Sequence, residues 1–457
     1  MAFYTNPNNP HPIDDAVSVS NNRYFNVIQV ADSNGIIIDP WGSSSSSAAN
    51  STDAFGRMKA SLPFTLGDYK HYPGVEYNFN DVEENGGSVT INNTAASATL
   101  ATTSNSSSLA IHQTKYYHPY QPGKSQEILT SFVLGSAETN VIKRVGYFDD
   151  ADGLFLQQSG NGELSFVVRS SVGGVLGDNA ITQEFWNIDK CDGTGDSGFD
   201  LNETKTQLLY IDFQWLGVGR VRFGFVHDGK IIVAHEEYHS NVLSTVYISN
   251  PNLPIRTEVR NTGATNGSSM DHICSTVISS GGYSETGVDF ATANSTARTT
   301  PAAGGTPYPV LAIRLKDSFK GQPNRASARV NNVSLSVETE SVLYKLIKVE
   351  SETDLTFQGG TAVWTSADPE SAVEYCVNAI TYQNGSVLNA GFIPAGSSQN
   401  SLSPGSFGEI SQSKKSAIMQ NYDSTDSQIY IVSAQTVATG NNVIANVSAA
   451  VQWRETY

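Results

Sequence analysis

Residues 207–263, QLLYIDFQWLGVGRVRFGFVHDGKIIVAHEEYHSNVLSTVYISNPNLPIRTEVRNTG, contain the pattern that decides the fold. From residue 221 onward, apolar side chains alternate with polar or small ones, which is the period of a half-buried β-strand. The apolar positions are Val221, Phe223 and Phe225. This alternation predicts that one face of the strand lies against a core.

The dipeptide Asp228-Gly229 separates this strand from a second apolar run. Asp-Gly between two such runs is a strong signal for a two-residue type I′ hairpin, and the turn then fixes the register. The predicted core wall consists of Val221, Phe223, Phe225, Ile232 and Ala234. The predicted facing pairs are Val226 with Ile231, Phe225 with Ile232, Phe223 with Ala234 and Arg220 with Glu237.

Two further apolar runs follow the hairpin, at residues 242–248 and 255–259. Pro251 and Pro254 lie between them, where prolines are tolerated in turns and at sheet edges. We therefore expect the stretch to continue as a meander of antiparallel strands.

The composition favours an all-β protein that is not a nucleic-acid binder. The 457 residues carry a formal charge of −17 and include 20 Tyr and 19 Phe, while only 16% are charged. Binding to nucleic acid or to an anionic membrane requires a basic patch, so the acidic balance argues against both. Many aromatic residues with few charges are typical of extracellular or particle-bound β proteins.

The cysteines and the N-terminus indicate folding in a reducing compartment. Cys191, Cys274 and Cys376 are odd in number and widely spaced, so we expect free thiols and neither a disulfide framework nor a zinc site of Cys-x-x-Cys type. The first twelve residues lack the basic and apolar segments of a signal peptide. No apolar run approaches the roughly 20 residues of a membrane span.

Changes in composition and strand pattern along the chain predict three structural regions. Residues 1–52 contain four prolines and a run of five serines, and we expect an extended arm that docks to a neighbouring subunit; a disordered leader is the alternative. Residues 53–349 hold many short strands separated by turns, which predicts a large jelly-roll β-sandwich of lectin-like kind. Residues 350–457 have the length and strand pattern of a small C-terminal β-sandwich.

The sequence His235-Glu236-Glu237-Tyr238-His239 matches the H-E-x-x-H motif of zinc proteases. In those enzymes the motif works on a helix, where residues four apart share a face. Here it follows the predicted hairpin, and on a strand such residues are about 13 Å apart, at ~3.3 Å per residue. We interpret the match as a coincidence, and a zinc protease is the third hypothesis for the chain.

Two acidic, glycine-rich loops are candidate sites for a structural Ca²⁺, which binds six to eight oxygen ligands. Neither has the spacing of the twelve-residue Ca²⁺ loop, and ordinary turn chemistry of Asp and Gly explains them equally well. The candidate ligands are Asp149, Asp150 and Asp152 in the first loop and Asp189, Asp192 and Asp196 in the second. We expect no other cofactor.

Trp186, Tyr116 and Tyr120 are candidates for stacking on a sugar, if they are exposed. Packing in the core or between subunits is the favoured interpretation of these aromatic residues. No nucleophile elbow, phosphate loop or dinucleotide fingerprint occurs, so we name no catalytic residue. Paired carboxylates for glycoside hydrolysis are defined by their arrangement in space, so the sequence leaves that alternative open.

Several motifs together resemble a family of virion structural proteins of tailed phages that infect marine bacteria and cyanobacteria. They cover residues 53–265 and are DAFGR (53–57), YQPGKS (120–125), NVIKRVGYFDDADG (140–153), WNIDKCDGTG (186–195), WLGVGRVRFGFV (215–226) and PNLPIR (251–256). The resemblance implies a particle protein made in the host cytoplasm, with architectural rather than catalytic motifs. Residues 350–457 lie outside it.

These observations lead to one leading hypothesis and one alternative. The leading hypothesis is a non-enzymatic virion component of tail or baseplate fibre type, or a head or neck decoration protein, that contacts other virion proteins. Homotrimers are expected by analogy. The alternative is a virion adhesin that binds or degrades carbohydrate.

Overall fold

Strands make up almost all regular structure in the computed structural model, which describes residues 30–31, 37–38, 63–71, 78–284, 286–399 and 417–457. The other regular elements in these ranges are three short 3-10 turns, η2 (Val172–Gly174), η3 (Gln183–Phe185) and η4 (Glu352–Asp354). Many strands bury every second residue, for example β8 (Gln126–Val133). Alternating sequence thus produces half-buried strands, and the prediction of an all-β sandwich protein is confirmed.

The chain divides into two compact units, residues 1–62 and Pro63–Tyr457. In the first unit, β1 (Val30–Ala31) pairs with β2 (Ile37–Ile38) in antiparallel fashion. The remainder of the predicted docking arm, residues 1–52, lies outside the described residues.

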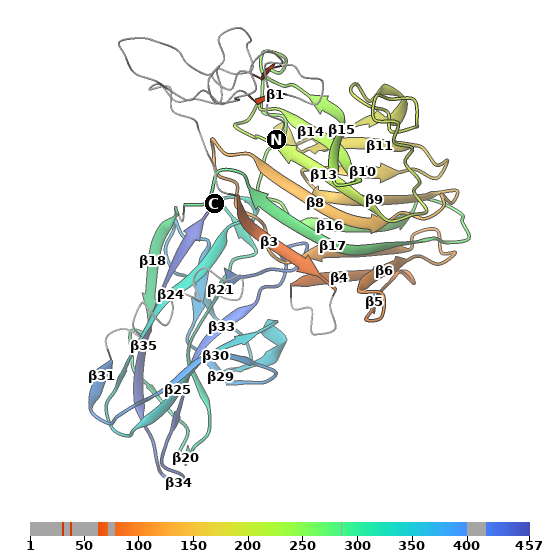
Figure 1. The fold of residues 1–457 in the computed structure, drawn as a ribbon. Helices are drawn as coiled ribbons and strands as arrows, with labels where there is room; N and C mark the ends of the chain where they lie inside the picture. Colours follow the sequence, from red (N-terminus) through yellow and green to blue (C-terminus); the bar gives the residue numbers. More distant parts are fainter. Residues whose placement is uncertain (1–29, 32–36, 39–62, 72–77, 285, 400–416) are drawn as a thin grey trace, which may run out of the picture. The chain divides into compact units, whose positions relative to one another are not determined.

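The second unit begins with a large sandwich of two antiparallel sheets, drawn in orange through green in Figure 1. The eight-stranded sheet has the order β15 (Lys230–Glu237), β14 (Val221–His227), β13 (Gln207–Phe213), β8, β17 (Ser269–Ser279), β6 (Ser97–Ala101) and β5 (Ser88–Asn92), and β3 (Phe64–Lys70) also pairs with β17. The seven-stranded sheet has the order β12 (Gly177–Thr182), β11 (Leu164–Ser170), β10 (Gly153–Gln158), β9 (Val141–Phe148), β16 (Ile255–Asn261), β7 (Leu109–Thr114) and β4 (Phe79–Glu84).

The space between these sheets is the core of the first sandwich. Phe223 of β14 is fully buried and stacks on Phe166 of β11 with the ring centroids 4.7 Å apart. Phe166 in turn stacks on Trp186 at 4.2 Å. Since β14 and β11 belong to different sheets, this aromatic stack joins the two layers.

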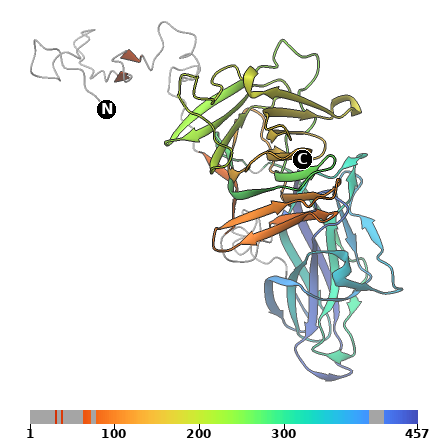
Figure 2. The same cartoon turned by 90° about the vertical axis from the view of Figure 1, so that its right-hand side faces the viewer.

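A second sandwich is built from the strands after residue 287, which Figure 2 shows in teal to blue. One sheet contains β18 (Val288–Ala293), β35 (Asn446–Thr456), β24 (Ser327–Val337) and β31 (Ser397–Gln399), with β19 (Arg298–Thr299) paired to β35 and β32 (Ala417–Ile418) to β24. The other contains β27 (Trp364–Ser366), β28 (Val373–Cys376), β21 (Tyr308–Leu315), β33 (Ile429–Thr436), β25 (Val342–Val349) and β30 (Ser386–Ile393). Three small pairs complete it: β20 (Ala303–Gly304) with β34 (Gly440–Asn441), β22 (Ser318–Phe319) with β23 (Gln322–Pro323), and β26 (Leu355–Phe357) with β29 (Ala379–Tyr382).

The sheets place the boundary between the sandwiches between β17 and β18, at residues 280–287, whereas the sequence predicted it near residue 350. Strand β25 lies before residue 350 but pairs along its whole length with β33, and β24 pairs with β35 in the same way. Residues 310–346 and 372–453 also share one hydrophobic cluster. The change in sequence pattern near residue 350 therefore marks a connection between strands of the second sandwich.

The Asp228-Gly229 hairpin forms as predicted, but its register changes by one residue. Val226 faces Ile231 and Phe225 faces Ile232, whereas a bulge between Phe223 and Gly224 makes Phe223 face His235. The extra residue is Ala234, whose carbonyl oxygen accepts hydrogen bonds from the backbone N–H groups of Ile188 and Asp189, both at 3.1 Å. The predicted Arg220–Glu237 pair is therefore wrong, and Arg220 lies 3.6 Å from Glu236.

The predicted meander ends at β15. Residues 242–248 form no strand, and the next strand, β16, pairs with β9 and β7 in the opposite sheet. The chain therefore crosses from one layer to the other over residues 238–254, a connection that local apolar patterning does not reveal.

Polar contacts join the two sandwiches. Lys115 Nζ lies 2.9 Å from Glu350 Oε2, and Arg329 donates a hydrogen bond to the Tyr116 hydroxyl at 2.7 Å. Burial alone would raise the pKa of Glu350, but Lys115 and Lys348 outweigh it and lower this pKa to about 2. Glu350 is thus held as a carboxylate at the junction.

The described part of the chain contains no helix long and apolar enough to cross a bilayer. Cys191 and Cys376 are buried and Cys274 is exposed, each as a free thiol.

Candidate functional site

The aromatic residues proposed from the sequence for sugar stacking lie in the interior. Trp186, Tyr116 and Tyr120 are 3%, 3% and 7% exposed. Trp186 is stacked on Phe166, and the Tyr120 hydroxyl accepts a hydrogen bond from the backbone N–H of Trp215 at 3.0 Å. These rings therefore offer no face to a sugar, and the favoured interpretation of packing in the core describes them.

The first acidic loop is organised by its own turn. Asp149 Oδ1 accepts hydrogen bonds from two backbone N–H groups of the loop, at 2.8 and 2.9 Å, and Asp149 Oδ2 lies 3.1 Å from Arg325 Nε. Asp150 pairs with Arg256 at 2.7 Å. Asp152 accepts a backbone N–H bond from Ser249 at 2.8 Å. These carboxylates serve as turn acceptors and cation partners.

In the second acidic loop, too, carboxylates accept hydrogen bonds from backbone N–H groups of the loop itself. Asp189 accepts hydrogen bonds from the N–H groups of Cys191 at 2.8 Å and Ser197 at 2.9 Å. Burial raises the pKa of Asp189, but these bonds outweigh it and hold the pKa below its ordinary value. Asp192 accepts an N–H bond within its own turn at 2.9 Å, and Asp196 is exposed.

The H-E-x-x-H motif begins on a strand, because His235 to Glu237 are the last residues of β15, whereas Tyr238 and His239 follow it. The strand spacing expected between the two histidines therefore does not apply. Glu237 lies between the two histidines: its Oε1 is 3.7 Å from His235 Nε2 and its Oε2 is 3.3 Å from His239 Nε2. His239 Nδ1 also bonds to the carbonyl oxygen of Gly219 at 2.7 Å. The motif forms a carboxylate-bridged histidine pair, which lacks the helical geometry of a zinc protease.

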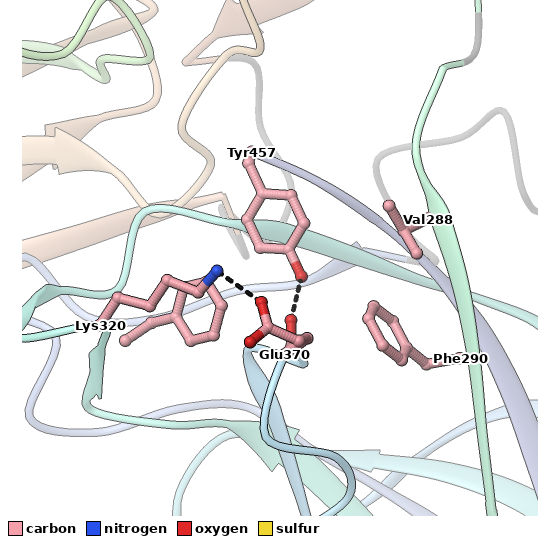
Figure 3. Close-up of a pocket in the computed structure, with 6 residues that line it drawn as sticks. Val288, Phe290, Lys320, Glu370 and Tyr457 are labelled. Atoms are coloured by element: carbon pink, nitrogen blue, oxygen red, sulfur yellow. Dashed lines mark hydrogen bonds and ion pairs between the residues drawn. The ribbon is translucent and has the colours of Figure 1, made fainter.

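An aromatic pocket in the second sandwich is the stronger candidate site. Its volume is 530 Å³, and Figure 3 shows its walls. Ligand pockets typically measure roughly 300–1,000 Å³ and combine apolar walls with a few polar groups. The lining residues are Val288, Phe290, Phe319, Lys320, Glu370 and Tyr457.

Four separate segments supply these residues. Val288 and Phe290 are in β18, and Phe319 and Lys320 are in the β22–β23 hairpin. Lys320 and Gly321 form the two-residue turn of this hairpin, and both have positive φ, 50° and 79°. A tight turn of this type keeps the two strands paired up to the turn itself. Phe319 and Lys320 are therefore held in one fixed wall of the pocket.

Tyr457 is fixed as an aromatic surface of the pocket. Its ring stacks on Phe319 with centroids 5.4 Å apart and planes 18° from parallel. The hydroxyl lies 2.9 Å from the Glu370 carbonyl oxygen and also within hydrogen-bonding distance of the buried Glu455 carboxylate. Burial and Glu455 raise the pKa of Tyr457, so its phenol stays protonated at neutral pH.

Charged groups lie at the rim of the pocket. Lys320 Nζ is 2.6 Å from the Glu370 carboxylate, and both side chains are well exposed, at 60% and 71%. Lys320 also lies over the Phe319 ring at 5.3 Å. Flat aromatic faces beside exchangeable polar groups match the two surfaces of a saccharide, whose C–H faces are apolar and whose hydroxyls donate and accept hydrogen bonds.

The sequence analysis did not identify any residue of this pocket. Phe290 is an isolated aromatic residue in a stretch rich in Gly, Ser, Thr and Ala, and Tyr457 lies after the last strand. A usable signal was the Lys320-Gly321 pair between Phe319 and Gln322, because such pairs favour a hairpin turn. Nothing local indicated that this hairpin would meet Phe290 and Tyr457.

No model of a known protein family matches the sequence, and no curated protein is similar to it. Solved structures are similar to about half of the chain. They include a protein of unknown function from Shewanella oneidensis MR-1 (TM-score 0.34, 12% identity, 54% of this chain and 99% of that one) and a β-glucanase from Bacillus licheniformis (0.30, 10%, 48% and 99%). A third is the CBM2 module of the evolved Dit of Lactobacillus casei BL23 phage J-1 (0.32, 8%, 50% and 100%). Likeness at this level assigns no ligand or activity to the chain.

Proposed function

We propose that this chain is a non-enzymatic surface protein of a tailed-phage particle and that its second sandwich binds a saccharide in the aromatic pocket. The single observation that carries the binding role is this pocket, in which the rings of Phe290, Phe319 and Tyr457 lie beside the Lys320–Glu370 pair. The particle role is supported by the motifs at residues 53–265, which resemble those of phage virion proteins.

The groups that line the pocket support a proposal of binding without hydrolysis. Most glycoside hydrolases use two carboxyl groups, one as acid and one as nucleophile or base. Glu370 is the one carboxylate among the described lining residues, and it is paired with Lys320. Glu455 lies behind Tyr457 and is fully buried, where Trp453 and the Ala372 N–H also bond to it. We therefore propose a lectin-like role for the pocket.

In this proposal the chain assembles with other virion proteins and with copies of itself, most simply as a trimer. Residues 1–52 supply the docking arm, the first sandwich forms the body, and the second sandwich presents the pocket. A fibre or baseplate position gives the pocket access to a bacterial surface, whereas a head or neck position makes adhesion secondary.

Tyr457→Ala tests the binding role directly. The wild-type chain should bind at least one member of an array of bacterial surface glycans, and titration calorimetry with that glycan should show affinity about 10-fold or more weaker for the variant. Tyr457 is 48% exposed and follows the last residue of β35, so its truncation should leave the sandwich folded.

Phe392→Ala is the matched control, because Phe392 is also an exposed ring of the second sandwich, at 66%, but does not line the pocket. It should bind the glycan like the wild type. Equal losses in both variants, or no glycan bound by the wild type, would contradict the binding role. Release of reducing sugar from the bound glycan would contradict the non-enzymatic role.

A further inference from the structure

Three buried histidines from distant parts of the sequence meet inside the first sandwich. His112 lies in β7 of the seven-stranded sheet, His272 lies in β17 of the eight-stranded sheet, and His71 directly follows β3. Each is at most 1% exposed. One ring nitrogen of each lies within 4.8 Å of the others, the only such group of three His, Cys, Asp or Glu residues in the described ranges.

Two of the histidines contact each other through ring nitrogens, and the third ring packs beside them. His71 Nε2 is 3.0 Å from His272 Nδ1, and the His71 and His112 ring centroids are 5.0 Å apart. Two imidazole ligands of a tetrahedral zinc, each about 2.0–2.1 Å from the metal, have their nitrogens roughly 3.3 Å apart. The His71–His272 nitrogen separation is within a few tenths of an ångström of that value, and the His112 nitrogen lies within 4.8 Å of both.

Outer contacts orient two of the rings. Asp81 Oδ1 lies 2.5 Å from His112 Nδ1, and the Ser275 hydroxyl lies 2.7 Å from His272 Nε2. Phe79 stacks on the His112 ring at 3.9 Å with the planes 8° apart. Metal-binding histidines usually use one nitrogen for the metal and the other for such an oxygen partner, which fixes the tautomer and the ring.

Neutral imidazole is the form of histidine that binds metals. Burial lowers the pKa of His272 well below its ordinary value, and His112 and His71 lower it further. A divalent cation at the centre of the cluster can be shared by all three rings.

We propose that His71, His112 and His272 bind one Zn²⁺ through Nε2, Nε2 and Nδ1, respectively. Imidazole nitrogens suit zinc, and a set of three leaves a fourth position for water or another small ligand. Since the ligands come from both sheets, the ion would cross-link the two layers of the first sandwich. This inference does not rest on the proposed saccharide pocket, which lies in the other sandwich.

Metal titration of the full-length chain, stripped with chelator and shown to be folded by circular dichroism, tests the site. The wild type should bind one Co²⁺ with the visible absorption of tetrahedral cobalt, and one equivalent of Zn²⁺ should abolish that absorption. Zinc should also raise the thermal unfolding midpoint. A folded wild-type chain that binds neither ion would overturn the proposal, whatever the variants do.

Variants then locate the ion. His71→Gln and His272→Gln should remove the tetrahedral cobalt signal, and Asp81→Asn should weaken zinc binding about 10–100-fold, because Asp81 acts only through His112. His235→Asn is the matched control from the H-E-x-x-H motif and should bind as the wild type does. Loss of the signal in His235→Asn, or its retention in folded His71→Gln, would overturn the assignment.

Discussion

Individual aromatic side chains make packing contacts between the two sheets of the first sandwich. Phe223 is fully buried, and its ring lies on Phe166, which in turn lies on Trp186. Truncating a side chain in such a stack removes its contacts and leaves a cavity, because the neighbouring backbone is fixed by two sheets.

Phe223→Ala should lower the free energy of unfolding of the chain by about 3–5 kcal/mol, the range seen when a buried Phe is truncated. Chemical denaturation, monitored by the fluorescence of the nearby Trp186, measures the change. Ile231→Ala is the control, because Ile231 is in the same hairpin but 50% exposed, and it should cost less than about 1 kcal/mol. A loss below that value for Phe223→Ala would mean that its ring is not a core contact.

At the scale of elements, two features set the strand register of the β14–β15 hairpin. The turn sets the pairs next to it, and a tertiary contact sets the pairs farther away. Asp228 and Gly229 have positive φ, 49° and 73°, as a type I′ turn requires, and they set the first pairs of the hairpin. The bulge at Ala234 then turns a carbonyl oxygen toward the segment that carries Trp186. The result is that β15 follows one register near the turn and another beyond it.

Gly224→Ala should destabilise this hairpin, because a Cβ at residue 224 would lie 2.1 Å from the carbonyl oxygen of Ile232. Overpacking of this kind costs about 1–3 kcal/mol, measurable as a lower midpoint of urea unfolding. Gly177→Ala in β12 is the matched control, since a Cβ there meets nothing within 4 Å and its φ is not positive. Equal midpoints for the two variants would contradict the close approach at the bulge.

At the scale of the whole molecule, the second sandwich is larger than the sequence suggested and includes residues 288–349. Strands β24 and β25 precede residue 350 and form its central pairs with β35 and β33. The pocket depends on this arrangement, because Phe290 and Phe319 come from before residue 350 while Glu370 and Tyr457 come from after it.

Under the proposed virion role, gold-labelled antibody against residues 288–457 on intact particles of the source phage should label the tail or baseplate if the pocket meets a bacterial surface. Antibody against the phage's major capsid protein is the control for particle integrity. Label over the head or neck would favour a decoration protein, and particles without label would contradict the virion role.

The sequence by itself determined the all-β class, the two strands of the hairpin and the Asp228-Gly229 turn, because these depend on side chains that are neighbours in the chain. Alternation at residues 221–225 depends on burial of one strand face, and Asp-Gly favours positive φ whatever surrounds it. The same local logic identified His235 to Glu237 as part of a strand rather than a metal-binding helix.

Only the tertiary structure decided which strands pair, where the sandwiches divide and which side chains meet. His71, His112 and His272 have no spacing that suggests a cluster, and Phe290 and Tyr457 come from unrelated segments. Such groupings arise from long-range strand order, which sequence periodicity does not encode. The burial of Trp186 depends on tertiary structure in the same way, because an aromatic residue in a polar loop can lie on the surface or fill the core. Here the ring that stacks on it, from β11, holds it in the core.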